Sequence, residues 1–138
     1  MVNAPHVHFN ISHAGKYIVC IVSDEPVGID IELLKSADLK IAERFFTSDE
    51  TEYIMLGEQT LRFCEVWTMK ESRIKREGLG LHKPLNSFSV FEPYAQERLA
   101  YHKIFQNNEA IGHVCSTKQS APSVRLIDIG TFMKNIQF

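Results

Sequence analysis

A chain of 138 residues, 44% hydrophobic and 23% charged, can bury one substantial core, so we expect a single domain over residues 1–138. Its net charge of −2 argues against nucleic acid or an anionic membrane as the main partner. No apolar run approaches the ~18 residues of a membrane span, no secretory pattern opens the chain, and its three cysteines are far apart. We therefore expect a cytoplasmic protein with reduced thiols and no membrane partner.

The first half of the chain predicts two strands followed by helices. We interpret residues 1–7 as a linker or arm and the polar segment 10–15 as a loop. Apolar runs predict strands at 17–22 and 27–32, and the four residues between them are few enough for a hairpin. Periodicity predicts helices that we place at 38–46, 49–56 and 61–76. The last helix has one apolar stripe, and Gly78 is its stop signal.

The second half predicts further strands. Four segments have the apolar pattern of strands, and Asn107 and Asn108 mark a turn between two of them: 88–91, 99–105, 111–116 and 124–129. Strands, then helices, then strands indicate an α+β fold in which helices pack on a largely antiparallel sheet. We expect the long helix to pack against that sheet.

Two acidic residues share one face of the second predicted strand. Asp30 and Glu32 alternate with apolar residues, so their side chains project from the same side. Two carboxylates on one face repel each other, and a fold that gathers them usually supplies a cation, a raised pKa or open solvent. A solvated strand face is the alternative interpretation of this pair.

The long helix carries a second charged pair. Glu71 follows Trp67 by one turn, and Lys75 follows Glu71 by another, so the three form a row beside the apolar stripe. An ordinary surface pair contributing ~0.2–0.5 kcal/mol is the alternative interpretation. Together with the strand carboxylates, Glu71 could hold Mg²⁺, which prefers oxygen ligands, while Lys75 neutralises a phosphate oxygen.

Several motifs, in order and spacing, resemble the 4'-phosphopantetheinyl transferases of the surfactin-synthetase-activating type. The resemblance covers about residues 8 to 91, and its motifs are 9–15 (FNISHAG), 28–32 (GIDIE), 44–50 (RFFTSDE), 67–72 (WTMKES), 75–81 (KREGLGL) and 84–88 (PLNSF). It implies a 4'-phosphopantetheinyl transferase-like lobe. It also implies transfer of the phosphopantetheine arm of coenzyme A to a serine of an acyl or peptidyl carrier protein.

The resemblance also implies roles for individual residues. Asp30, Glu32 and Glu71 would hold Mg²⁺ against the pyrophosphate, and Lys75 would neutralise the pyrophosphate or protonate the leaving group. Glu71 or Glu50 would accept the proton of the serine hydroxyl. Two further residues, Ser12 and His13, would contact coenzyme A.

Local structure alone could account for two of these residues. Glu50 lies three positions after Thr47, the spacing of a capping box at a helix start, so its carboxylate could serve the helix instead of the reaction or serve both. His13, in a polar segment, could be an ordinary surface histidine.

The chain differs from the surfactin type in length. That type has two similar lobes with coenzyme A between them, and this chain resembles the second lobe and the segment before it. A smaller holo-acyl-carrier-protein synthase type builds the cleft between subunits. We therefore expect a homo-oligomer, a trimer or a dimer, and an active transferase; the alternative is a non-catalytic or truncated lobe that docks carrier proteins without efficient use of coenzyme A.

Overall fold

The computed structural model describes residues 6–78, 83–92, 98–128 and 134. Its elements, in chain order, are β1 (His8–Ala14), β2 (Tyr17–Ser23), β3 (Gly28–Leu33), the 3-10 turn η1 (Leu34–Ser36), α1 (Leu39–Phe45), α2 (Ser48–Met55), α3 (Gln59–Glu77), the 3-10 turn η3 (Leu85–Ser87), β4 (Ala100–Gln106) and β5 (Ala110–Ser116). The α+β class and the antiparallel pairing predicted from the sequence are confirmed. No helix in these ranges combines the length and apolarity needed to cross a membrane.

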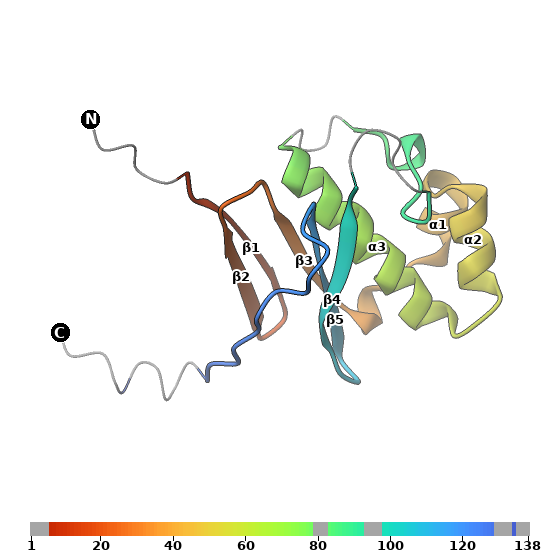
Figure 1. Cartoon of the computed structure of the whole chain (residues 1–138). Helices are drawn as coiled ribbons and strands as arrows, with labels where there is room; N and C mark the ends of the chain where they lie inside the picture. The colour runs from red at the N-terminus through yellow and green to blue at the C-terminus, as the bar shows by residue number, and fades with distance from the viewer. Residues whose placement is uncertain (1–5, 79–82, 93–97, 129–133, 135–138) are drawn as a thin grey trace.

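The described strands form two antiparallel sheets. One is the hairpin of β1 and β2, and the other has the strand order β3-β5-β4. Figure 1 shows the hairpin on one side of the three-stranded sheet and α3 on the other, with α1 and α2 beyond α3. The long helix therefore packs against the sheet, as expected, with β3 and β5 beneath it.

Helix α3 is the centre of the fold. The side chain of Glu58 accepts a hydrogen bond from Leu61 N at its start, and Gly78 ends it in the left-handed conformation with φ of 68°. Its buried residues surround much of the helix and include Lys70 and Arg73. The prediction of one buried stripe was therefore too narrow, because α3 contacts the sheet on one side and α1 and α2 on another.

The main core lies on the helical side of the sheet. Phe46, Phe63 and Trp67 form an aromatic group there, with ring centroids 5.4 to 6.3 Å apart; Phe63 stacks on the other two rings, which are tilted to each other. Two smaller apolar clusters lie on the opposite side of the sheet, around Ile31 and Ile29, and pack against Val19 of the hairpin. The sheet is thus buried on both faces.

Side chains join the hairpin to the three-stranded sheet. Ile29 N donates to Asn10 Oδ1 at 2.9 Å, and Ile31 N donates to Ser12 Oγ at 3.2 Å. No backbone hydrogen bond between β1 and β3 is found in the described ranges. These two side chains of β1 therefore satisfy amides along the edge of β3 that would otherwise be unpaired.

Two predictions near the N-terminus were wrong, one of a loop and one of a hairpin. The segment 10–15 was expected to be a loop, but residues up to Ala14 belong to β1. The strands at 17–22 and 27–32 exist, yet they do not form a hairpin with each other, since β2 pairs with β1 and β3 pairs with β5. Asn10 and Ser12 do alternate with Phe9 and Ile11, but it is their polar side chains that face β3, which sequence polarity alone does not indicate.

Two other predicted strands are absent from the described residues. Residues 88–91 begin as irregular chain and end in a turn, and Phe88 and Val90 are buried in the main core. Residues 124–128 have no regular structure, and Ile129 lies outside the described residues. Alternating apolar residues in both segments resemble a strand, but neither segment has a strand partner. The helices, β4, β5 and the turn at Asn107 are confirmed within about two residues.

Candidate active site

A glycine on β3 brings α3 close to the strand. A Cβ built on Gly28 would lie 1.8 Å from the backbone oxygen of Ser72 and 2.6 Å from Arg76 N, so only glycine allows this approach. Side chains alternate along a strand, so Asp30 and Glu32 face α3 as Gly28 does. The strand carboxylates and the middle of α3 are thereby packed together.

Asp30 is buried at this contact, with 8% of its surface exposed. Its Oδ1 accepts a hydrogen bond from Ser12 Oγ at 3.1 Å and lies 3.4 Å from Lys75 Nζ. Burial raises the pKa of Asp30 to about 7 against the lowering effect of Lys75 and Ser12, and the charge of Glu71 raises it further. The solvated strand face that was the alternative interpretation is thus wrong for Asp30.

Glu71 faces the same acidic surroundings from α3. Burial raises the pKa of Glu71 above its usual range, Lys75 lowers it, and the nearby charge of Glu32 raises it again. The charge of Glu71 thus acts on Asp30, and the charge of Glu32 acts on Glu71. Burial is the first cause of both shifts, and the neighbouring negative charges add to it.

Lys75 bridges the acidic residues and the hairpin. Its Nζ donates to the backbone oxygens of Ile29 at 3.1 Å and Ile11 at 3.3 Å, besides pairing with Asp30. About 30% of the Lys75 side chain remains exposed. It is therefore more than an ordinary surface partner of Glu71, and its ammonium stands where a phosphate could also reach it.

The carboxylates of this site meet some of the requirements of a hard cation such as Mg²⁺. In the described part of the chain, no three His, Cys, Asp or Glu side chains are already gathered closely enough to hold a metal ion. Mg²⁺ commonly uses only one or two carboxylates and completes its shell with waters and phosphate oxygens. Burial is the largest cause of the raised pKa values of Asp30 and Glu71, and a divalent cation bound beside them would favour their ionised forms.

Glu50 lies elsewhere, in the interior beside Lys70, and both side chains have 0% exposure. Its Oε1 is 2.9 Å from Lys70 Nζ and accepts from Val90 N at 2.8 Å, while its Oε2 accepts from Thr47 N at 3.0 Å. The capping box predicted from the sequence is confirmed. Because both oxygens of Glu50 are bonded away from solvent, we assign it a structural role and leave it out of our proposed reaction.

Lys70 is the partner that sequence reasoning missed. Its ammonium donates to the backbone oxygens of Leu85 and Phe88, both at 2.6 Å, and lies 4.2 Å from the centroid of the Phe88 ring. Lys70 falls at the helical spacing of the buried residues Phe63, Val66 and Ile74, which was the available signal that this lysine points inward.

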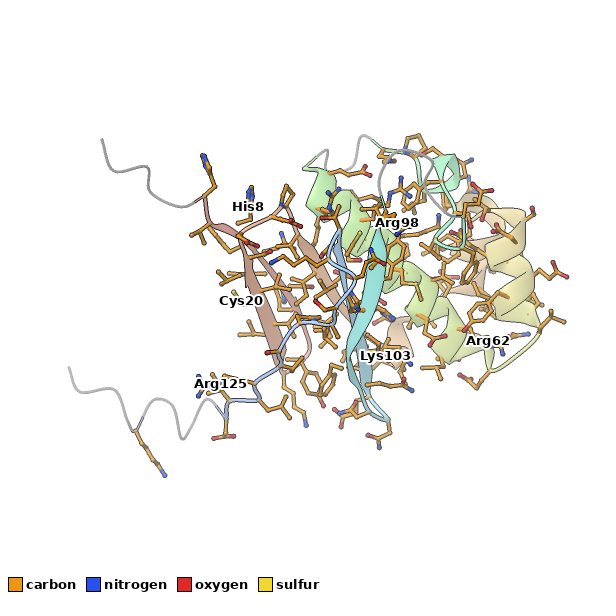
Figure 2. All side chains as sticks on the ribbon, viewed as in Figure 1. His8, Cys20, Arg62, Arg98, Lys103 and Arg125 are labelled. Atoms are coloured by element: carbon orange, nitrogen blue, oxygen red, sulfur yellow. The ribbon has the colours of Figure 1, made fainter. Side chains whose placement is uncertain are left out.

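The two residues expected to contact coenzyme A point in different directions. Ser12 is on the inner face of β1 and bonds to Asp30, whereas His13 is exposed on the outer face, paired with Ile18 of β2. Figure 2 labels Cys20, another exposed residue of this hairpin. The structure therefore brings Ser12, and not His13, to the acidic residues.

Another histidine was missed because it stands alone in the sequence. His113 of β5 pairs with Asp30 across the sheet, is buried, and has its Nδ1 2.8 Å from Thr68 Oγ1 of α3. Burial lowers the pKa of His113 to about 4, so the ring is neutral near pH 7. A neutral imidazole bonded to α3 helps to fix the helix over the acidic strand.

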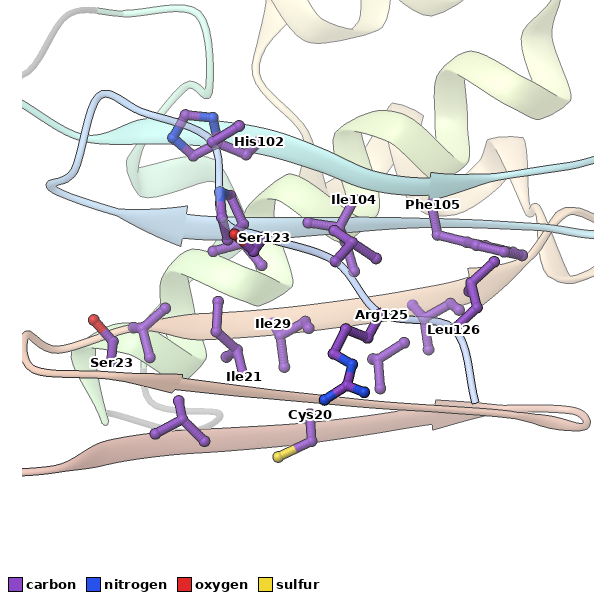
Figure 3. A pocket seen from close by; sticks show the side chains of 18 of the residues that line it. Cys20, Ile21, Ser23, Ile29, His102, Ile104, Phe105, Ser123, Arg125 and Leu126 are labelled. Carbon is purple, nitrogen blue, oxygen red and sulfur yellow. The ribbon is translucent and has the colours of Figure 1, made fainter. Parts of the chain in front are cut away.

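A separate apolar hollow of about 1380 Å³ lies on the other face of the sheet. Figure 3 shows Ile21 of β2, Ile29 of β3 and Ile104 of β4 around it, with Arg125 and Leu126 of the C-terminal segment crossing it. None of the residues that sequence reasoning placed in the site lines it. The sheet separates this hollow from Asp30, so the two are different places.

Comparisons with known proteins match this chain to one family. The family model for the 4'-phosphopantetheinyl transferase superfamily matches residues 26–128. Three similar proteins are "4'-phosphopantetheinyl transferase Sfp" of Bacillus subtilis (strain 168), "4'-phosphopantetheinyl transferase gsp" of Aneurinibacillus migulanus, and "4'-phosphopantetheinyl transferase HetI" of Nostoc sp. (strain PCC 7120 / SAG 25.82 / UTEX 2576).

The similarity to these relatives covers part of each chain. Sfp is 49% identical over 89 residues, which are 62% of this chain and 40% of Sfp. The gsp protein is 49% identical over 89 residues, 61% of this chain and 37% of its own, and HetI is 37% identical over 81 residues, 54% of this chain and 34% of its own. The match thus spans about two fifths or less of the length of these relatives. Because the family model covers more than half of the chain, this protein belongs to the 4'-phosphopantetheinyl transferase superfamily.

Proposed function

We propose that this chain transfers the 4'-phosphopantetheine arm of coenzyme A to a serine of an acyl or peptidyl carrier protein, with Mg²⁺, in the cytoplasm. The observation that carries the proposal is the packing of α3 on Gly28, which gathers Asp30, Glu71 and Lys75 in a member of this superfamily. Burial disfavours the charged forms of Asp30 and Glu71, so packing these two carboxyl groups at one contact does not by itself stabilise the fold.

In the proposed reaction, the serine oxygen of the carrier protein attacks the phosphorus that bears the pantetheine arm. A new P–O bond forms, the pyrophosphate P–O bond breaks, and adenosine 3',5'-bisphosphate leaves. Asp30, Glu32 and Glu71 would hold Mg²⁺, which when bound neutralises charge on the pyrophosphate. We assign Glu71 as the acceptor of the serine proton, directly or through a water, because its side chain is only half-buried and lies near Lys75.

Lys75 has a distinct task in this proposal. Its ammonium is partly exposed and already lies beside Asp30, so a short movement brings it to a phosphate oxygen. There it offsets the negative charge that develops on the departing bisphosphate. Positioning and charge neutralisation of this kind account for most of the catalysis in phosphoryl transfer.

We propose that a second copy of the chain packs on the outer face of the hairpin. Phe9 and Val22 are paired across β1 and β2 and are 69% and 67% exposed, and Ile11 and Ile18 on the same face are also mostly exposed. Soluble monomers rarely leave such a continuous apolar face uncovered. His13 shares this face, so a second wall here would bring a ligand phosphate within its reach.

The proposal is tested by incubating the protein with coenzyme A, Mg²⁺ and apo carrier proteins, and weighing the carrier by mass spectrometry. We expect the mass of the arm on the carrier serine for the wild type, and loss of transfer for Glu71→Gln with the fold unchanged, because Glu71 is only half-buried. Transfer by Glu71→Gln at the wild-type rate would contradict its role.

Light scattering distinguishes a homo-oligomeric transferase from the alternative function. The alternative function, a lobe that docks carrier proteins without efficient use of coenzyme A, is favoured by the two-fifths coverage of the relatives. An active strict monomer would contradict the second copy, and an inactive monomer that binds carrier protein would establish the alternative.

A further inference from the structure

Ser12 makes two hydrogen bonds that join the hairpin to the acidic site. Its Oγ accepts from Ile31 N at 3.2 Å and donates to Asp30 Oδ1 at 3.1 Å, with 6% of the residue exposed. A hydroxyl has one proton to donate. Because Ser12 Oγ accepts the bond from Ile31 N, its own proton can be donated to Asp30. A phosphate oxygen, which can only accept, would have to compete with Asp30 for that proton.

Asn10 is a natural comparison for Ser12. It lies on the same face of β1, two residues earlier, and its Oδ1 accepts from Ile29 N at 2.9 Å. Both residues therefore satisfy an edge amide of β3. Of these two, Ser12 alone also contacts the Asp30 carboxylate.

We propose that Ser12 is a positioning residue, whose hydroxyl fixes the rotamer of Asp30 and presents its carboxylate to the cation. Ser12 Oγ and Lys75 Nζ both lie close to the same oxygen, Oδ1, at 3.1 and 3.4 Å. A hydrogen bond to a ligating carboxylate orients it and is worth about 10- to 100-fold in metal affinity. The inference rests on the proposed function only in taking Asp30 as a metal ligand.

This assignment departs from the role of coenzyme A contact that the sequence resemblance implied for Ser12. It also gives the hairpin a task in the site, because β1 carries the hydroxyl that orients a side chain of β3. A shift of β1 along β3 would break both bonds of Ser12 together.

The test measures the χ1 rotamer of Asp30 by NMR three-bond couplings in the metal-free protein. We expect one rotamer in the wild type, averaged rotamers in Ser12→Ala, and recovery of one rotamer in Ser12→Thr, which restores the hydroxyl. Asn10→Ala removes an edge acceptor in the same way but leaves the Asp30 bond, so it should keep the wild-type rotamer. Should Ser12→Ala not fold, Ser12→Cys is nearly isosteric and takes its place.

Calorimetric titration with Mg²⁺ alone gives the second readout. We expect affinity about tenfold weaker for Ser12→Ala and within about twofold of the wild type for Asn10→Ala. A single Asp30 rotamer in the Ser12→Ala protein would overturn the inference, as would equal rotamer averaging in the Asn10→Ala protein. Absence of Mg²⁺ binding in the wild type would count against the proposed function instead, while the rotamers still decide the role of Ser12.

Discussion

Replacing Gly28 by alanine tests whether the close contact of β3 and α3 builds the site. The added Cβ would lie 1.8 Å from the backbone oxygen of Ser72 and 2.6 Å from Arg76 N, whereas ordinary contact begins near 3.4 Å. Both atoms belong to the helix backbone, so a side-chain rotation cannot relieve the overlap. The strand and the helix must separate by more than an ångström, because the overlap with Ser72 O exceeds that distance.

We expect Gly28→Ala to lower the free energy of unfolding by about 1–3 kcal/mol or more, the usual cost of overpacking. Urea denaturation measures the loss, and Gly112→Ala is the matched control. Gly112 lies in the adjacent strand β5, and a Cβ there would meet Asp30 O at 3.2 Å, a contact that small shifts can relieve. Equal stability of Gly28→Ala and the wild type would refute the reasoning.

Three further predictions concern charge. The pKa of Asp30 is raised to about 7, so between about pH 4 and pH 7 the native state keeps a proton that the unfolded state has released. The free energy of unfolding should therefore fall by about 1–4 kcal/mol as pH rises through this window. In urea denaturation, Asp30→Asn should flatten this pH profile. Lys70→Met should lower the free energy of unfolding by about 3–5 kcal/mol, because it leaves Glu50 buried without its partner. Adding Glu50→Gln should restore part of that stability, and a loss below about 1 kcal/mol for Lys70→Met would contradict the importance of the interior pair. Reversing the charges of Lys40 and Arg44, both exposed on α1, should slow stopped-flow association with an acidic carrier protein and weaken its salt dependence, and an unchanged rate at low salt would exclude this surface.

Much of the site was predictable because it depends on local periodicity. Alternation along the strand placed Asp30 and Glu32 on one face, and helical spacing placed Glu71 and Lys75 one turn apart. Gly28 in the same strand was the signal for a close approach, although its partner on α3 could not be read from the sequence. The structure adds that Asp30 is buried and that its pKa is raised. Both properties depend on the elements that pack over this residue.

The missed features depend on tertiary pairing. The sequence predicted a loop in place of β1 because Asn10, Ser12 and His13 make the segment polar, and the role of Asn10 and Ser12 becomes visible only when β3 lies beside them. Residues 88–91 alternate like a strand because Phe88 and Val90 fill the core near Lys70. A strand needs a neighbouring strand, and sequence alternation alone does not supply one.

The most direct test of the central claim is calorimetric titration of Mg²⁺ into the protein at pH 8 with coenzyme A present. We predict one Mg²⁺ per chain for the wild type and affinity at least tenfold weaker for Asp30→Asn, checked to be equally folded by circular dichroism. Equal Mg²⁺ affinity in the two proteins, or none in the wild type, would contradict the claim that β3 and α3 build a metal and phosphate site.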